Sequence, residues 1–146
     1  MLKTILGVIV GYVVFSISLF ELFSGLYLIL GADKSFMPGN FDLTLSWILP
    51  SIVVFFVAAA LASTVCAVIA KDPKSGLYMG ATIFVIGIIM AAMQIAQDPG
   101  ITLRSTSDVG LLDAMNQAHG PVWSFFINPI AGFIGAVSGG NLFAKK

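Results

Sequence analysis

Charged residues are scarce in this sequence. Only 10% of its 146 residues are Asp, Glu, Lys or Arg, whereas an average soluble domain has about 25%. Hydrophobic residues make up 58% of the chain, more than a water-soluble fold of this size could cover, so we expect the solvent to be lipid. Seven basic residues balance seven acidic ones, and this balance gives no indication of a nucleic-acid partner.

Cysteine and histidine each occur once, as Cys66 and His119. A single cysteine excludes an internal disulfide and a cysteine-based metal cluster, and a single histidine excludes a bis-histidine haem held within one chain. Cys66 lies in an alanine-rich segment with no base beside it, so it is not expected to act as a nucleophile. We therefore expect no catalytic residues, no metal, no cofactor, and a protein that is not an enzyme.

Four long apolar stretches stand out, at about residues 5–30, 47–70, 76–97 and 122–144. Each exceeds the roughly 18 residues that distinguish a membrane-spanning helix from a buried one. The first is too long for the apolar region of a signal peptide and has no convincing cleavage site, so we expect it to be retained. The sequence predicts an all-α membrane protein, with a single transmembrane domain over residues 1–146 that forms a four-helix bundle.

The basic residues predict the orientation. Lys34 and Arg104 fall at one membrane face, and the other five fall at the opposite face: Lys3, Lys71, Lys74, Lys145 and Lys146. By the positive-inside rule the face with five is cytoplasmic, so both the N- and the C-terminus are predicted to lie in the cytoplasm. A bacterial inner membrane is the default location for this multi-pass protein.

The connections between the stretches differ in length. Residues 71–75 form a tight link, whereas residues 31–45 and 99–119 are longer outer loops that are predicted to form a small cap. Three apolar residues of the second outer loop fall on one side of a helix: Val109, Leu112 and Met115. This pattern predicts a short helix, which either lies on the outer membrane interface or is an ordinary capped loop helix.

Small residues recur along one side of each predicted helix. In the first helix this stripe runs through Gly7, Gly11, Val14, Ser18, Glu21 and Gly25. The spacing alternates between four and three, which is the pattern of a left-handed bundle. The positions that we expect to form the helix-packing seam are Gly7, Gly11, Ser18, Gly25, Gly80, Gly87, Gly132, Gly135 and Gly139. Most phenylalanines lie off these stripes, and they are predicted to meet lipid or a neighbouring subunit.

Glu21 is the one charged residue inside a predicted span. An ionised carboxylate in the membrane costs about 2.5 kcal/mol or more, so it should be neutral, paired or facing water. We expect Glu21 and Asn128 to form an intramembrane polar pair, which is either structural glue or part of a proton or cation pathway. Pro129 follows Asn128 and is expected to kink or break the last helix. Such breaks mark binding sites in some transporters.

Two functional hypotheses follow from these features. The first is a small accessory or structural subunit, whose partners are the lipid bilayer and either a larger membrane complex or further copies of itself. The alternative is a small ion- or proton-coupled transporter or channel that uses Glu21 and the Asn128–Pro129 helix break. Four helices with a glutamate in the first resemble the small multidrug resistance transporters. Those proteins are shorter, have brief loops and carry Trp and Tyr motifs that this sequence lacks, so the resemblance stops at these two features.

Overall fold

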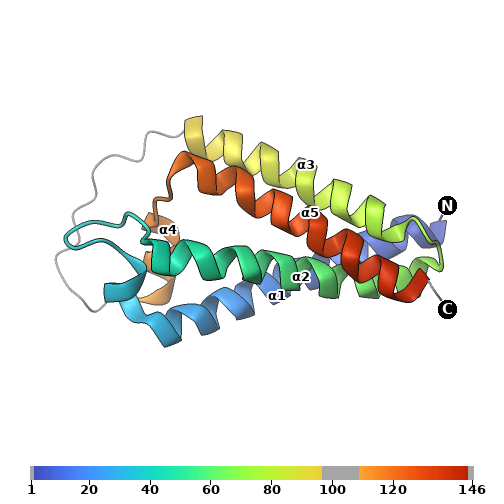
Figure 1. Ribbon diagram of the computed structural model, residues 1–146, viewed down its shortest axis with the longest axis horizontal. Coiled ribbons are helices and arrows are strands. Elements are labelled where there is room, and N and C mark those ends of the chain that lie inside the picture. The colour runs from blue at the N-terminus through green and yellow to red at the C-terminus, as the bar shows by residue number, and fades with distance from the viewer. Residues whose placement is uncertain (1, 97–108, 145–146) are drawn as a thin grey trace.

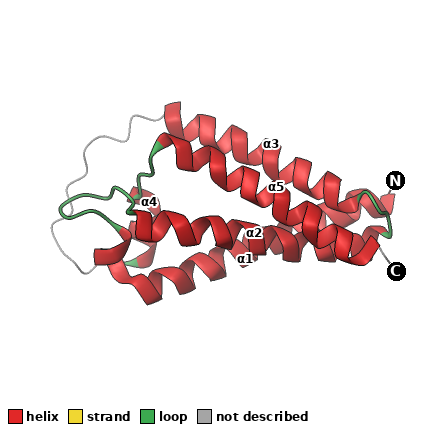
Figure 2. Ribbon diagram, in the orientation of Figure 1, coloured by secondary structure: helices red, strands yellow, loops and turns green. Residues whose placement is uncertain are grey.

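The computed structural model describes residues 2–96 and 109–144, and this part of the chain folds into five helices and no strand (Figure 1 and Figure 2). The helices are α1 (Leu2–Ser35), α2 (Leu45–Ala70), α3 (Ser75–Ala96), α4 (Leu111–Gln117) and α5 (Val122–Ala144). All but α4 are long and apolar enough to cross a membrane. The predicted all-α bundle of four long helices is therefore confirmed, and the composition of these helices makes this a small membrane protein.

The four long helices run antiparallel in sequence order, so that both ends of the chain lie at one end of the bundle (Figure 1). We refer to this end as the terminal end, and to the opposite end, where α4 lies, as the cap end. Around the bundle, α1 packs on α2, α2 packs on α5, and α5 packs on α3. Much of the outer surface is apolar, and Leu28 and Ile29 are each 80% exposed, as expected for side chains that meet lipid.

Local sequence accounts for the ends of the long helices. Gly31 interrupts α1 with a φ of 68° and a ψ of 174°, a backbone conformation that only glycine adopts without strain. Helix α2 ends at Lys71, whose N–H donates a hydrogen bond to the carbonyl of Ala67. The link to α3 is then tightened by Asp72, whose carboxylate accepts a hydrogen bond from the N–H of Lys74. This short connection places α2 and α3 in an antiparallel hairpin.

The terminal half of the bundle is packed through glycines, which let helix backbones approach one another closely. A methyl group on Gly7 would lie 3.0 Å from the carbonyl oxygen of Cys66, and one on Gly11 would lie 3.0 Å from that of Ala62. Two glycines of α5, Gly135 and Gly139, lie in the same way against the backbone of α2. Met79, Cys66 and the buried alanines of α2 fill the remaining core.

The inward row of α1 differs from the predicted seam. Its inward side chains follow one another at intervals of four residues: Gly7, Gly11, Phe15, Leu19, Phe23 and Tyr27. The alternating seam that we predicted departs from this row after Gly11, so Ser18 is only half-buried. A methyl group on Gly25 would meet nothing within 4 Å, so Gly25 is not a packing position in this chain. The two patterns separate because each step of four residues turns a little more than one full helical turn, whereas alternating steps of four and three stay on nearly the same side of the helix.

In the cap, the connection between α1 and α2 is hydrogen-bonded to the segment that precedes α5. The N–H of Leu43 donates to the carbonyl of His119 (2.8 Å), and the N–H of His119 donates to the carbonyl of Phe41 (2.9 Å). The Tyr27 hydroxyl of α1 donates to the carbonyl of Val109 (2.7 Å). A second hydrophobic cluster forms beneath these bonds, around Phe36, Phe41 and Ala114. The predicted cap and short helix are therefore present.

The apolar residues that predicted α4 lie mostly on the exposed side of this helix. Ala114 is buried and Leu111 packs against the cap cluster, whereas Leu112 is 67% exposed and Met115 47% exposed. Of the three residues that predicted this helix, only Val109, which precedes α4, packs against the cluster.

Candidate functional site

A cavity of about 420 Å³ lies in the cap half of the bundle, where the α1–α2 pair and the α3–α5 pair diverge (Figure 1). Its lining is mainly apolar and includes eight aromatic side chains: Tyr12, Phe15, Phe23, Tyr27, Phe36, Trp47, Phe55 and Phe125. Cavities of a few hundred Å³ with mostly apolar walls are typical of sites for small molecules. The cavity is therefore the strongest candidate for a functional site.

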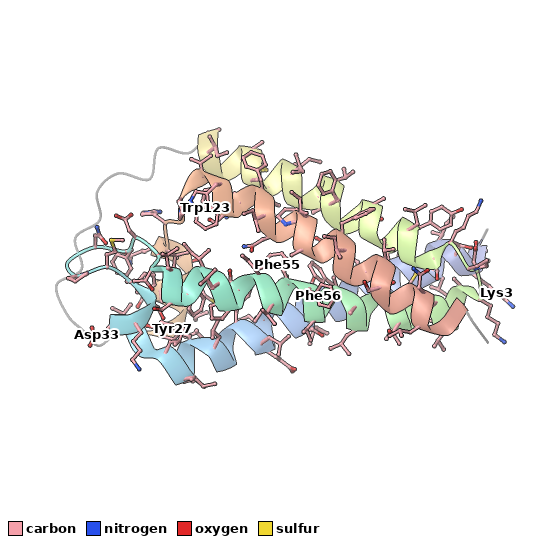
Figure 3. The ribbon with its side chains drawn as sticks, viewed as in Figure 1. Lys3, Tyr27, Asp33, Phe55, Phe56 and Trp123 are labelled. Carbon is pink, nitrogen blue, oxygen red and sulfur yellow. The ribbon has the colours of Figure 1, made fainter. Side chains whose placement is uncertain are left out.

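Ring contacts between α1 and α2 build one wall of the cavity. Phe23 stacks on Trp47 with the ring centroids 5.7 Å apart, and its other ring contact is with the edge of Phe55 at 5.8 Å. Phe55 also meets Phe15 at 6.1 Å, and it projects from α2 towards the opposite helix pair (Figure 3). Edge-to-face and offset pairs of this kind are favourable beyond the area that they bury, so this wall is a connected aromatic surface.

Helices α3 and α5 form the opposite wall, and α4 closes the cap end. Ile83, Ile86 and Met90 line the cavity from α3, while Ala114 and Ala118 line it from the cap. Met90 is 52% exposed and Met115 of α4, also a lining residue, is 47% exposed. The cavity thus reaches the protein surface beside α3 and α4.

Six lining side chains carry polar groups: Tyr12, Tyr27, Ser51, Gln94, Ser124 and Asn128. Three of the six, Tyr27, Ser51 and Ser124, donate hydrogen bonds to backbone carbonyls. The Ser51 hydroxyl donates to the carbonyl of Ile48, and that of Ser124 donates to the carbonyl of Pro121, each at 2.7 Å. Asn128 is different, because its Oδ1 is buried and has no hydrogen-bond partner. Buried polar atoms are nearly always paired, so this amide is the chemically distinctive group of the cavity. None of the described lining residues is charged.

The structure does not bring Glu21 and Asn128 together, and the predicted polar pair is not formed. Glu21 lies on the exposed side of α1, and among the described residues α1 makes no contact with α5, which carries Asn128. The prediction placed Glu21 on the alternating seam, whereas the inward row has period four. The carboxylate therefore points away from the other helices.

Pro129 does not break α5, which is continuous from Val122 to Ala144. This corrects the predicted helix break at Asn128–Pro129. A proline in a helix removes one backbone hydrogen bond and crowds the preceding turn, and here its ring fits against a glycine of the neighbouring helix. A methyl group on Gly87 of α3 would lie 2.6 Å from the Cγ of Pro129.

The remaining seam residues lie at helix contacts. Gly80 faces Phe133, and Gly132 faces Ile83, both between α3 and α5. The phenylalanines divide differently from the prediction: Phe20 is 49% exposed, whereas Phe15, Phe23 and Phe55 turn inward and line the cavity. For Phe15 and Phe23, the sequence signal that could have found the inward position is the four-residue spacing that they continue from Gly7 and Gly11.

Comparisons with known proteins yield no relative: no protein-family model, no curated protein and no solved structure matches this chain. The class that the fold defines is a small four-helix membrane protein with an aromatic cavity.

Proposed function

We propose that this protein is a non-enzymatic accessory subunit that assembles with another membrane protein through the outer face of α1. The observation that carries this proposal is the exposed position of Glu21. Ten residues separate Glu21 from the interruption at Gly31, which corresponds to about 15 Å along the helix. This depth places the carboxyl group well within the apolar part of the span.

A carboxyl group at this depth needs a partner, because lipid offers it no hydrogen bond. The neighbouring serines of α1 are already engaged: the Ser24 hydroxyl donates to the carbonyl of Phe20 (2.6 Å), and that of Ser16 donates to the carbonyl of Tyr12 (3.0 Å). No hydrogen bond or ion pair joins Glu21 to any other residue in the described ranges. We therefore propose that the partner comes from another chain.

The side chains of the membrane helices favour a different protein as the partner of Glu21 over a second copy of this chain. The four membrane helices contain no basic residue between their end turns, so a second copy could meet Glu21 only with neutral groups. A basic or hydrogen-bonding side chain in a transmembrane helix of another protein would satisfy the carboxyl group directly. Gly25, one turn away, leaves open space beside it, which allows such a helix to approach.

The test is recovery of the complex from native membranes in mild detergent. Glu21→Leu should lower the recovery of a stoichiometric partner by about three- to thirtyfold, the effect of losing one intramembrane polar contact. Ser16→Leu is the matched control, because it removes another exposed polar group from the same helix. Retention by Glu21→Gln would indicate a neutral hydrogen bond, and loss would indicate a cationic partner.

Thermal unfolding of the isolated variants separates assembly from folding. We expect Glu21→Leu to melt at or above the wild-type temperature, because nothing within the described chain depends on the carboxyl group. The wild-type chain could instead purify as a homo-oligomer that Glu21→Leu disrupts. That result would show that the partner of Glu21 is a second copy of this chain and not a different protein. Unchanged behaviour of all three variants, with no partner recovered, would refute the subunit proposal.

The second candidate is a small transporter, and the cavity is the observation that favours it. Transport would have to use the cavity rather than Glu21, which does not line it. It would also require the glycine-packed terminal half to open, because Gly135 and Gly139 lie against the backbone of α2 there. Substrate-dependent flux in liposomes containing the purified chain alone would favour the transporter over the subunit.

A further inference from the structure

We propose that the aromatic cavity holds one hydrocarbon chain of a membrane phospholipid from the leaflet at the cap end, while the headgroup of that lipid stays outside at the membrane interface. Three properties of the cavity support this occupant: its apolar lining, its length along the bundle and its opening at the side. Glu21 does not line the cavity, so the inference does not rest on the proposed subunit function.

The lining of the cavity favours a hydrocarbon. A volume of about 420 Å³ lies among mostly apolar side chains, as in sites that bury most of a small molecule. The rings of Phe23, Trp47 and Phe55 form one connected wall. None of the described lining residues is charged, and an ionised group inside would lack a counter-charge. The part of a ligand that lies in the cavity is therefore apolar and uncharged.

Few of the polar lining groups are free to bind a ligand. Three hydroxyls already donate to backbone carbonyls, those of Tyr27, Ser51 and Ser124. Asn128 also lines the cavity, but its unpartnered Oδ1 is fully buried and out of reach of a ligand. Tyr12 and Gln94 are the two lining side chains that remain, and their polar atoms make no hydrogen bond within the described part of the chain.

Gln94 and Tyr12 lie at opposite ends of the cavity. Gln94 is exposed and lies two residues before the end of α3, so its amide is at the membrane interface, level with the ester and headgroup region of a lipid. Tyr12 is half-buried and is the lining residue of α1 nearest to the terminal end. A lipid inserted from the cap end has only the end of its chain at that depth. We therefore expect the Tyr12 hydroxyl to take no part in binding.

The length of the cavity matches one leaflet of the bilayer. At the cap end it is lined by Trp47, Gln94 and Ser124, each of which lies two residues from an end of its helix. At the deep end it is lined by Phe55 and Ile83. The rise along α3 from Ile83 to Gln94 is about 16 Å, and one leaflet of the hydrocarbon core is about 15 Å thick. A single chain from the cap-end leaflet therefore spans the cavity.

The opening of the cavity runs along α3. Ile86, Met90 and Gln94 follow one another at intervals of four residues, and all three line the cavity without being buried. Met90 is 52% exposed, and methionine side chains adapt readily to a neighbouring molecule. A slot along the side of a helix lets a chain enter from the bilayer while its headgroup remains outside.

The experiment compares two neighbours on α2, both labelled in Figure 3. Phe55 lines the cavity, whereas Phe56 is 38% exposed and does not line it. Phe55→Trp and Phe56→Trp are each made in the full chain after Trp47→Phe and Trp123→Phe have removed the two native tryptophans. The chains are reconstituted in vesicles of phosphatidylcholine brominated near the end of one chain, because bromine quenches tryptophan fluorescence at short range. We expect quenching in both chains, by cavity lipid in the first and by bulk lipid in the second.

Filling the cavity separates these two sources of quenching. Ala91 is buried and lines the cavity, so Ala91→Phe should abolish the quenching of Phe55→Trp and leave that of Phe56→Trp unchanged. Ala92→Phe is the matched control, because Ala92 is exposed and does not line the cavity. Ala114→Phe fills the cavity from the cap and decides the question if Ala91→Phe does not fold.

Two further measurements complete the test. Tyr12→Phe should leave the quenching of Phe55→Trp unchanged, because a hydrocarbon chain makes no hydrogen bond to the hydroxyl. If the chain without native tryptophans does not fold, Trp123→Phe alone leaves Trp47, which lines the cavity near its mouth. Lipid brominated near the ester should then quench Trp47, and the filling variants should abolish that quenching.

Four outcomes would overturn the proposal. Absence of quenching in Phe55→Trp would show that no chain enters the cavity, and quenching there by aqueous acrylamide instead would show that the cavity holds water. Quenching by brominated lipid that survives both filling variants would show that bulk lipid reaches Phe55 by another path. Loss of quenching in Tyr12→Phe would show that the occupant places a polar group at the deep end.

Discussion

The ring of Pro129 in α5 lies against Gly87 of α3, so closely that a methyl group on Gly87 would come within 2.6 Å of the Pro129 Cγ and 2.8 Å of its Cβ. This contact sits beside the cavity, since both residues line it. It explains how α5 carries a proline in mid-span and remains close to α3: the glycine provides the space that the ring occupies.

Gly87→Ala should therefore destabilise the bundle by about 1–3 kcal/mol, the usual cost of overpacking a tight contact. Thermal unfolding in detergent, followed by circular dichroism, measures the effect. Gly25→Ala is the matched control, because a methyl group there meets nothing within 4 Å, and it should melt with the wild type. Equal melting of both variants would show that the ring has room to move away.

The hydrogen bond from Tyr27 to the carbonyl of Val109 ties the cap to α1. Tyr27→Phe should lower the free energy of unfolding by about 1 kcal/mol and speed amide hydrogen exchange in residues 109–117. Tyr78→Phe on the exposed side of α3 is the control and should change neither quantity. Unaltered exchange in Tyr27→Phe would mean that the cap is held by its hydrophobic cluster alone.

Cys66 is fully buried, and its Sγ lies 3.9 Å from the carbonyl oxygen of Ser75. We expect it to react slowly with a maleimide in the folded protein and quickly after denaturation, because folded packing excludes the reagent. A Cys66→Ser, Lys71→Cys double variant provides the comparison, since Lys71 is exposed between α2 and α3. Labelling of Cys66 as fast as that of the double variant would reveal an opening in the terminal half.

The orientation in the membrane is predicted from the basic residues. Reporter tags at either terminus, or inserted at residue 73, should report the cytoplasm, and a tag at residue 39 should report the opposite side. Lys71 and Lys74 flank the first insertion site. The reverse pattern, with residue 39 in the cytoplasm, would show that the few lysines of this chain do not determine its orientation.

The helices could be predicted from the sequence, because a span needs a long apolar run and such runs are unmistakable. The face that each helix turns inward was harder to predict. In water the apolar side is the buried side, but lipid is as apolar as the core, so composition does not distinguish them. On α1 the predicted alternating seam and the observed row of period four share Gly7 and Gly11. The next residue is Val14 in the predicted seam and Phe15 in the observed row, and it is Phe15 that is buried.

That divergence also explains why the site was missed. Because Phe15 points inward, Phe23 and Tyr27 point inward as well, since they follow at intervals of eight and four residues. These rings line the cavity in the part of α1 where the prediction had placed the small residues Ser18 and Gly25 at the helix contact. The same rotation carries Glu21 to the outside. Asn128 was singled out as an intramembrane polar residue, and its Oδ1 is buried without a hydrogen-bond partner, but the partner predicted for it, Glu21, lies on the exposed side of α1.

The glycine contacts of the terminal half leave little tolerance for change, because Gly139 and Gly135 touch the backbone of α2 and a backbone cannot be exchanged for something smaller. The rings of the cap half, by contrast, touch mainly other side chains. Their sizes can be altered one at a time while the helices stay anchored elsewhere. A designer could therefore reshape the interior of this protein at the cap end and leave the glycine contacts of the terminal end untouched.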